Sequence, residues 1–311
     1  MNGYCRIIAK IVTGLLLLAL GMSALNCRAA DLKARLQEIA DDFDGRLGIA
    51  LLCGEDIISV RGDDAFPMLS VYKFPQALAV AHYCQARGIA FEDSIDIRAD
   101  QILPDTYSPM RERYGITALR LPIMELLAYT LQQSDNNACD ILFELIGGPA
   151  YADSVISLLG FDKIKIISTE AEMHDDLELC RINSASPLQT VLLLEYFYNS
   201  LKDNSAEHSS IARLMEQCET GVNRLAMPLL ERGLVFGHNT GTGDRSEDGL
   251  LIGCNDVGYV VGPDGRPCFI AVYATDSPLP LEEVEKVLAN ISRTVLDDGN
   301  FFLPLPSNFQ H

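Results

Sequence analysis

The residues most able to do chemistry together are a serine and a lysine in the stretch PMLSVYKFPQALAVA, residues 67–81. Ser70 stands at the predicted start of an apolar helix, and Lys73 follows three residues later. Residues at i and i+3 share a helix face, so the hydroxyl and the amine can lie within hydrogen-bond reach. A helix N-terminus also offers free N–H groups and the positive end of the helix dipole. Such a hydroxyl can act as a nucleophile, with the amine as activating neighbour and a backbone N–H to stabilise the oxyanion.

Taken alone, the S-x-x-K pattern is short, and it also fits a helix-start serine followed by a surface lysine. Three further polar stretches carry similar alternatives: Ser134-Asp135-Asn136, residues 170–174 (EAEMH) and residues 238–243 (HNTGTG). Singly, they fit a helix stop with its cap, a solvated acidic loop and a turn. The order and spacing of all four stretches are what favour a functional interpretation.

Together the four stretches resemble the motif set of class A β-lactamases and penicillin-binding proteins, which is S-x-x-K with S-D-N and K-T-G. The resemblance covers nearly the whole chain from about residue 31. Around residues 104–109 and 241–245 it is greatest to the extended-spectrum subgroup with an altered omega loop. It implies a serine hydrolase that acts on β-lactams, with no metal and no cofactor.

The resemblance implies four catalytic residues. Ser70 would be the nucleophile that opens the lactam ring, with Lys73 as the amine beside it. Ser134 would relay a proton to the leaving nitrogen. Glu170 would activate the water that hydrolyses the acyl-enzyme, since a carboxylate one water away from an ester carbonyl is what general-base deacylation needs. Whether Lys73 or Glu170 acts as base in acylation stays open, because the family itself is disputed on this point.

The residues implied to bind substrate are Tyr107, Asn136, Asn239, Thr240, Gly241, Thr242 and Arg224. Tyr107 would wall the pocket, and Asn136 would hold the amide side chain of the substrate. Backbone N–H groups of Ser70 and Thr242 would form the oxyanion hole. His174 stands where most class A enzymes have an asparagine that helps to hold the deacylating water, and a histidine can still donate one hydrogen bond.

One position departs from the family pattern in a way that affects charge. The family has lysine where this chain has Asn239, and that cation attracts the substrate carboxylate. Charge-assisted hydrogen bonds are about twice as strong as neutral ones, so the loss would cost on the order of 2–4 kcal/mol, or roughly 30- to 1000-fold in rate. Arg224 or Arg245 could supply a replacement cation. Asn239→Lys is therefore expected to raise turnover of penicillins or cephalosporins by about tenfold or more.

Two alternative functions compete with a β-lactamase. A penicillin-binding transpeptidase or DD-peptidase shares the fold, but Glu170 argues against it because such enzymes lack the deacylating carboxylate. A non-catalytic protein that binds β-lactams or peptidoglycan fragments is favoured only by Asn239. Adduct formation and drug loss discriminate the three.

The elements that must position these residues follow from the hydrophobic periodicity. A helical period covers residues 31–43, and apolar strand-length runs at 46–53 and 57–61 flank a turn. Helical signals fill the middle of the chain, except for residues 161–185, where no regular period survives. Short strand-like runs at 235–238, 249–253, 257–261 and 268–274 precede a closing helix at 280–296.

Two hairpin strands do not make a stable sheet alone, so the early strands are expected to pair with the late ones. The predicted fold class is α/β (α+β), a β-lactamase/penicillin-binding-like fold with an antiparallel sheet flanked by helices and an inserted all-α domain. The predicted division is a signal peptide at 1–30, a sheet domain at 31–65 with 217–311, and an all-α domain at 66–216.

The first 30 residues have the order of a secretory signal peptide. Arg6 and Lys10 precede an apolar run at 11–20, and small residues follow up to Ala29-Ala30, the expected cleavage site. The run is too short to span a bilayer by itself. Cys27 raises the alternative of a lipid anchor, which the preceding asparagine fits poorly. We expect an exported, periplasmic monomer with no stable membrane span.

Charge and cysteine usage exclude other classes. The net charge of −19 argues against nucleic-acid binding, which needs basic patches. Seven cysteines follow residue 30 with no C-x-x-C pair, which argues against metal ligation and redox catalysis. Their odd number and apolar surroundings predict buried free thiols that act as small hydrophobes.

Overall fold

The fold is built on a five-stranded antiparallel sheet in the order β2-β1-β10-β9-β8. The computed structural model describes residues 29–203, 205–263 and 265–298. The strands are β1 (Arg46–Cys53), β2 (Asp56–Val60), β8 (Phe236–Thr242), β9 (Cys254–Val261) and β10 (Pro267–Thr275). β1 pairs with β10 over its whole length, from Arg46 opposite Thr275 to Cys53 opposite Cys268. The prediction that early strands pair with late ones is confirmed.

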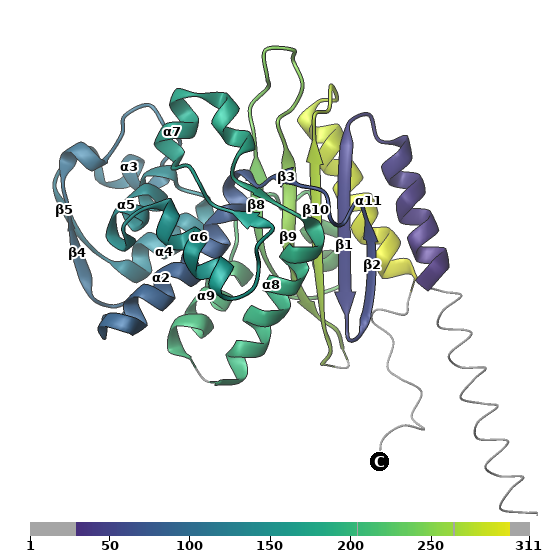
Figure 1. Cartoon of the computed structure of the whole chain (residues 1–311), viewed down its shortest axis with the longest axis horizontal. Helices are drawn as coiled ribbons and strands as arrows, with labels where there is room; N and C mark the ends of the chain where they lie inside the picture. Colours follow the sequence, from purple (N-terminus) through teal and green to yellow (C-terminus); the bar gives the residue numbers. More distant parts are fainter. Residues whose placement is uncertain (1–28, 204, 264, 299–311) are drawn as a thin grey trace, which may run out of the picture.

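Both faces of this sheet are covered because successive side chains of its strands point to opposite sides. Ile49 and Leu51 join a core with the helix over residues 29–42 and with α11 (Leu281–Asp297). Ala50 and Leu52 of the same strand join the larger core of the helical block. Figure 1 shows the two terminal helices on one side of the sheet and the helical block on the other.

The helical block lies between β2 and β8 in the sequence. Its helices are α2 (Lys73–Arg87), α3 (Pro109–Tyr114), α4 (Ile123–Gln133), α5 (Asn136–Ile146), α6 (Pro149–Leu158), α7 (Glu170–Asp175), α8 (Pro187–Ser200) and α9 (Ala206–Glu216). The next helix, α10 (Ala226–Glu231), packs instead in the core that contains α11. The block also contains two small sheets. One consists of β3 (Phe66–Pro67), β6 (Ile164–Lys165) and β7 (Ser184–Ala185), and the other of β4 (Ser94–Ile97) and β5 (Leu119–Pro122). The domain boundaries given above stay a prediction.

Local signals account for most helix ends. Gly88 adopts a left-handed conformation (φ 66°) at the C-terminus of α2, where glycine carries no Cβ penalty. Ser186 caps α8 by accepting a hydrogen bond from the Gln189 N–H, and Pro187 occupies the first turn. These ends confirm the predicted helices.

Three local predictions were wrong. Residues 161–185 contain α7 and a 3₁₀ helix, η3 (Leu177–Arg181), which are too short to produce a periodic pattern. Residues 249–253 contribute only isolated bridges at Leu251, because the chain turns there. Ser70 lies in a 3₁₀ helix, η1 (Leu69–Tyr72), directly before α2 and not in its first turn.

The expectation of free thiols throughout was also wrong for one pair. Cys53 and Cys268 form a disulfide, although 215 residues separate them in the sequence. They face each other across β1 and β10, so the strand register determines this pairing. The remaining described cysteines are free thiols: Cys84, Cys139, Cys180 and Cys254 are buried, and Cys218 is half-buried.

The features assigned to the signal peptide, including the Cys27 alternative, lie outside the described residues, except that Ala29 and Ala30 open the helix at 29–42. Within the described ranges, no single helix combines the length and apolar character needed to cross a membrane. One bent pair, α5 with α6 at 72°, passes that test by length and composition only. The same ranges hold no group of three or more residues suited to binding a metal ion.

Candidate active site

The ammonium group of Lys73 is the point on which the polar side chains of the helical block converge. Lys73 is fully buried at the start of α2. Its Nζ donates to Oγ of Ser70 (3.1 Å) and Oγ of Ser134 (3.2 Å), and to the backbone oxygen of Ser134 (2.8 Å). It also donates to Oδ1 of Asn136 (2.8 Å) and forms an ion pair with Oε1 of Glu170 (2.9 Å). The structure therefore brings all four predicted catalytic residues together.

The charge on Lys73 is fixed by this environment. Burial alone would lower the pKa of the amine, but the Glu170 carboxylate beside it raises the pKa above its ordinary value. Lys73 is therefore a cation in the free site. A buried cation of this kind requires a partner of opposite charge, which Glu170 provides.

Ser70 is held in place by the sheet behind it. Nδ2 of Asn255 on β9 donates to the backbone oxygens of Pro67 (2.8 Å) and Met68 (3.0 Å), just before η1. Gly241 on β8 lies so close that a Cβ there would come within 2.5 Å of the Met68 oxygen and 3.3 Å of the Ser70 nitrogen. The glycine of the N-T-G stretch therefore permits the edge strand to approach the nucleophile.

The bend between α4 and α5 presents Ser134 and Asn136. Ser134 adopts a left-handed conformation (φ 58°), which is uncommon outside glycine and turns the chain sharply. The buried Asp135 fixes the bend by accepting from Met110 N (2.7 Å), Ala138 N (2.8 Å) and the Ser108 hydroxyl. Burial raises its pKa, and these donors oppose that shift. The predicted helix stop is thus also the support of two site residues.

Glu170 is positioned by a residue that the sequence analysis did not identify. The two carboxylate oxygens of Asp140 on α5 accept the N–H groups of Glu170 and Ala171, each at 2.8 Å. Burial raises the pKa of Asp140 to about 7. The available sequence signal was an acidic residue inside the apolar run ACDILF, where an ion needs a specific partner.

The pocket beside these residues has a volume of about 350 Å³. Its described lining residues are Leu69, Ser70, Thr106, Tyr107, Ser134, Asn136, Glu170, Met173, His174, Leu177, Cys180, Thr220, Thr240, Thr242, Gly243 and Asp244. We call Ser70, Ser134, Asn136 and Glu170 the helical wall, and Thr220, Thr240 and Thr242 the strand wall.

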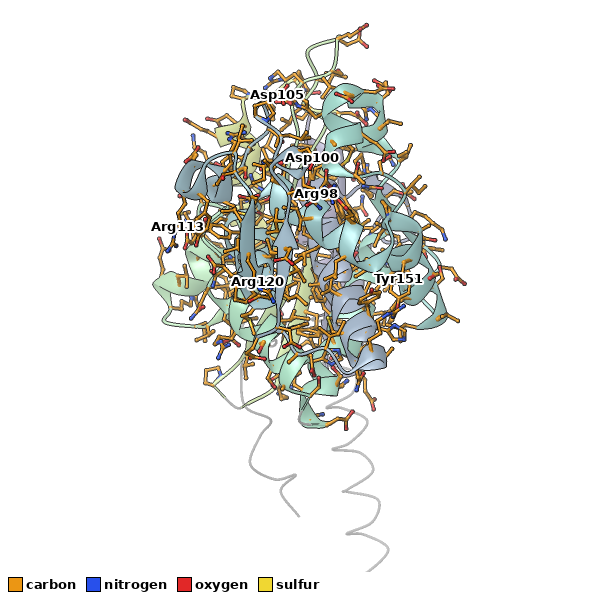
Figure 2. The ribbon with its side chains drawn as sticks, turned by 90° about the vertical axis from the view of Figure 1, so that its left-hand side faces the viewer. Arg98, Asp100, Asp105, Arg113, Arg120 and Tyr151 are labelled. Atoms are coloured by element: carbon orange, nitrogen blue, oxygen red, sulfur yellow. A yellow bond between two sulfur atoms is a disulfide. The ribbon has the colours of Figure 1, made fainter. Side chains whose placement is uncertain are left out.

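The rim of the pocket carries the exposed predicted residues. The Tyr107 side chain is 56% exposed, and its backbone oxygen accepts the Asn136 N–H (3.1 Å). Nε2 of His174 lies 3.5 Å from Oδ2 of Asp105. Figure 2 shows Asp105 towards one end of the molecule, beyond Asp100 and Arg98. The Nδ2 of Asn136 donates to Oγ1 of Thr106 (2.9 Å), a contact the sequence analysis missed.

On the strand wall, the structure places Asn239 differently from Thr240 and Thr242. Asn239 is 1% exposed and does not line the pocket, because alternate residues of a strand face opposite sides. With its amide nitrogen directed at them, it donates to the backbone oxygens of Ser70 (3.0 Å) and Val71 (3.2 Å). Asn239 thus ties the edge strand to η1.

Arg224, also predicted to bind substrate, lies buried behind the strand wall. Its NH2 donates to Oγ1 of Thr242 (2.6 Å), its NH1 donates to the Gly241 oxygen (3.1 Å), and its Nε pairs with Glu285 (3.1 Å). Arg245 does not line the pocket; its guanidinium donates to the oxygens of Gly249 and Leu279. Of the two candidate replacement cations, only Arg224 contacts a residue of the wall.

Known proteins resemble this chain over most of its length. The sequence model described as "Beta-lactamase enzyme family" matches residues 31–298. A beta-lactamase of Bacteroides uniformis is 34% identical over 270 residues, which are 86% of this chain and 91% of that protein. The crystal structure of the TLA-1 extended-spectrum beta-lactamase superposes with a TM-score of 0.82 at 34% identity, covering 87% of this chain and 98% of that one.

A class A beta-lactamase from Bacteroides cellulosilyticus is similarly close in structure. It superposes with a TM-score of 0.83 at 29% identity, covering 88% of this chain and 98% of the other.

Proposed function

This chain belongs to the beta-lactamase enzyme family as a class A member that hydrolyses β-lactams, and we propose that it does so through an acyl-enzyme on Ser70. The observation that carries this route is the convergence of Ser70, Ser134, Asn136 and Glu170 on the Lys73 ammonium. A nucleophile, a proton relay and a carboxylate base are then all within one hydrogen bond of the same cation. Hydrolysis of the ring inactivates the antibiotic and so confers resistance.

In the acylation step, Ser70 Oγ attacks the lactam carbonyl and the oxyanion is stabilised by the N–H groups of Ser70 and Thr242. Because Lys73 is already a cation, it can accept the serine proton only after giving one to Glu170. The proton lost by Ser70 therefore ends on Glu170, and Lys73 and Glu170 act as a pair. Ser134, 3.2 Å from Nζ, then passes its proton to the leaving lactam nitrogen and takes another from Lys73. Lys73 in turn takes the proton back from Glu170, so the carboxylate is free again before deacylation.

In the deacylation step, Glu170 activates a water that attacks the ester on Ser70. Its carboxylate lines the pocket, while Asp140 holds the backbone at the start of α7. His174, one turn further along α7, also lines the pocket, which supports a role in holding this water. The carboxylate that penicillin-binding peptidases lack is thus held beside the nucleophile.

The substrate carboxylate is bound by Thr242 with charge supplied from behind the wall. Because Arg224 donates to Oγ1 of Thr242, the threonine hydroxyl is left to donate its own proton into the pocket. This relay takes over part of the role that the family lysine has at the position of Asn239. A hydroxyl with a buried guanidinium behind it gives a weaker but directed anion site.

Intact-mass spectrometry over time, with drug loss followed in parallel, tests this route. Benzylpenicillin and a cephalosporin are each mixed with the protein and with Ser70→Ala. A transient adduct with steady drug loss, absent in the variant, is expected. A lasting adduct without drug loss would instead indicate a penicillin-binding peptidase. Binding without any adduct would indicate a non-catalytic receptor for the drug.

We also propose that the chain is exported to the periplasm as a monomer after cleavage near Ala29 or Ala30. The order of basic, apolar and small residues in 1–30 supports this. The intact mass of protein recovered from the periplasmic fraction of an expressing bacterium tests the cleavage site. A mass including residues 1–28, or a lipid added at Cys27, would contradict it.

A further inference from the structure

A second group of reactive side chains lies behind the strand wall and takes no part in the proposed hydrolysis. It consists of Cys218 after α9, His238 on β8 and Asp256 on β9. Nδ1 of His238 lies 2.9 Å from Oδ1 of Asp256, and both side chains are buried. His238 also interacts with the Cys218 thiol, through charge and a side-chain hydrogen bond. The order thiol, imidazole, carboxylate is the arrangement that activates a cysteine nucleophile.

The surroundings hold this group in one geometry. The second oxygen of Asp256 accepts the Leu225 N–H (3.1 Å), and the Phe236 ring stacks on the imidazole with centroids 4.7 Å apart. Burial alone would lower the pKa of His238, but Asp256 and Cys218 raise it to about 10. Burial would raise the pKa of the Cys218 thiol, yet the His238 charge lowers it below its ordinary value. Both shifts favour the charged pair of a thiolate and an imidazolium over the neutral pair.

We propose that Cys218, grouped with His238 and Asp256, is a modification site whose sulfur reacts with peroxides and with small soft electrophiles. Among the free cysteines described, it is the half-buried one, whereas Cys84, Cys139, Cys180 and Cys254 are buried. Burial raises the pKa of Cys180 to about 11, although this thiol also lines the pocket. Location near the pocket is therefore shared by Cys180 and Cys218, and the imidazole partner is what distinguishes them.

Hydrogen peroxide can oxidise Cys218 with His238 as the only other reacting group. The Cys218 sulfur attacks one peroxide oxygen, so that an S–O bond forms and the O–O bond breaks. The sulfur loses two electrons to the peroxide and becomes a sulfenic acid. The hydroxide that leaves takes the proton of the His238 imidazolium and becomes water, and His238 ends neutral.

Cys218 is also connected to the pocket through two hydroxyl groups. Its sulfur lies 3.4 Å from Oγ1 of Thr220, and that oxygen lies 2.6 Å from Oγ1 of Thr240. Both threonines belong to the strand wall. A group added to the sulfur changes its contact with the Thr220 hydroxyl, so modification is expected to alter substrate binding more than the chemical step.

Alkylation of the folded protein by limiting iodoacetamide between pH 5.5 and 9.5 tests the proposal, with labelled positions read by peptide mapping. Cys218 is expected to react at least tenfold faster than Cys180 at pH 6.5, with an apparent pKa clearly below the ordinary value of about 8.5. In guanidinium chloride the difference should vanish. Equal rates in the folded protein, or an apparent pKa at or above 8.5, would overturn the proposal.

His238→Gln sharpens the result, because it keeps a hydrogen-bonding side chain without the charge. Alkylation of Cys218 at pH 6.5 should slow at least tenfold; an unchanged rate would show that the imidazole is not the activating group. The wild-type pH profile stands even if this variant does not fold. These readouts need no β-lactam turnover, so their failure is separate from failure of the proposed hydrolysis.

The connection between Cys218 and the pocket is tested separately, by steady-state kinetics. After peroxide treatment, trapped with dimedone, KM for a penicillin should rise at least threefold with little change in kcat. Cys218→Ser treated in the same way should show no change. If Cys218 is modified and KM stays constant, the connection through Thr220 and Thr240 is wrong.

Discussion

On the helical wall of the pocket, polar side chains converge directly on the Lys73 ammonium, whereas the strand wall presents three threonines and keeps its charges behind them. Lys73 and Glu170 form a largely buried ion pair, 2.9 Å apart, directly beside the pocket. Arg224 reaches the strand wall only through the hydroxyl of Thr242, at 2.6 Å. A charged group that transfers a proton must be in direct contact with the reacting atoms. A charged group that only attracts an anion can act through a bridging hydroxyl. The helical wall is therefore expected to control kcat and the strand wall KM.

The largest expected effect comes from removing the base of the helical wall. Glu170→Gln keeps the shape and a hydrogen-bonding group but loses the carboxylate, so deacylation should slow by about 10³-fold. Without that carboxylate, burial lowers the pKa of Lys73, so the neutral amine can accept the Ser70 proton itself and acylation continues. The acyl-enzyme should then accumulate and be visible by intact mass. Glu172→Gln, a neighbouring substitution on α7 whose carboxylate caps the helix at Thr169, is the control and should turn over normally. Rapid turnover by Glu170→Gln would show that the helical wall does not control kcat.

A smaller effect is expected from the charge behind the strand wall. Arg224→Gln should raise KM for penicillins about 30-fold and leave kcat within a few fold, because a charge-assisted contact is lost from binding. Steady-state kinetics measures both constants. Thr242→Ala should reproduce the KM change without disturbing the pair between Arg224 and Glu285. Arg245→Gln, outside the pocket lining, is the matched control and should have no effect.

Adding a cation at position 239, which adjoins the strand wall but faces η1, should make the two walls more alike. Asn239→Lys is expected to raise kcat/KM for anionic β-lactams about tenfold, since the described strand wall contains no lysine or arginine. Asn239→Ala removes the same contacts with the Ser70 and Val71 oxygens but adds no charge, so it should lower kcat/KM. Equal effects of the two substitutions would show that the tie to η1, and not the charge, limits turnover.

The smallest effect concerns the support of the helical wall. Burial raises the pKa of Asp140 from about 4 to about 7, so between these pH values the folded protein binds a proton that the unfolded chain has lost. The contribution of Asp140 to stability therefore falls as pH rises, by up to about 1.4 kcal/mol per pH unit, and levels off above pH 7. Asp140→Asn should flatten this slope in denaturant titrations at pH 5, 6, 7 and 8. A slope that is unchanged in the variant would assign it to other groups.

The parts of the fold that follow local rules could be predicted well. The i, i+3 spacing of Ser70 and Lys73 brought their side chains to 3.1 Å even though Ser70 lies in a 3₁₀ helix. Ser186 and Pro187 marked the start of α8, and Gly88 marked the end of α2. The short helix α7 could not be found in the same way, because six residues do not complete two turns of hydrophobic pattern.

The candidate site was predictable to the extent that motif residues carry it. Asp140 was missed because an acidic side chain on a helix gives no indication of the backbone it will cap 30 residues later. Thr220 belongs to no motif, yet it lines the pocket and contacts the hydroxyl of Thr240. Cys218 and His238 were each visible in the sequence, but nothing local relates the end of α9 to a residue of β8.

The sequence by itself determined the chemistry available at Ser70, the antiparallel sheet with its inserted helices, and the uncharged side chain at Asn239. These depend on residue type and on spacing within one element, where backbone geometry fixes which side chains are neighbours. The tertiary structure alone decided that Asn239 faces η1, that Arg224 stands behind Thr242, and that Cys53 pairs with Cys268. Contacts such as that of Asn255 with Pro67 join residues 188 positions apart, and their geometry is set by strand register, which no local pattern encodes.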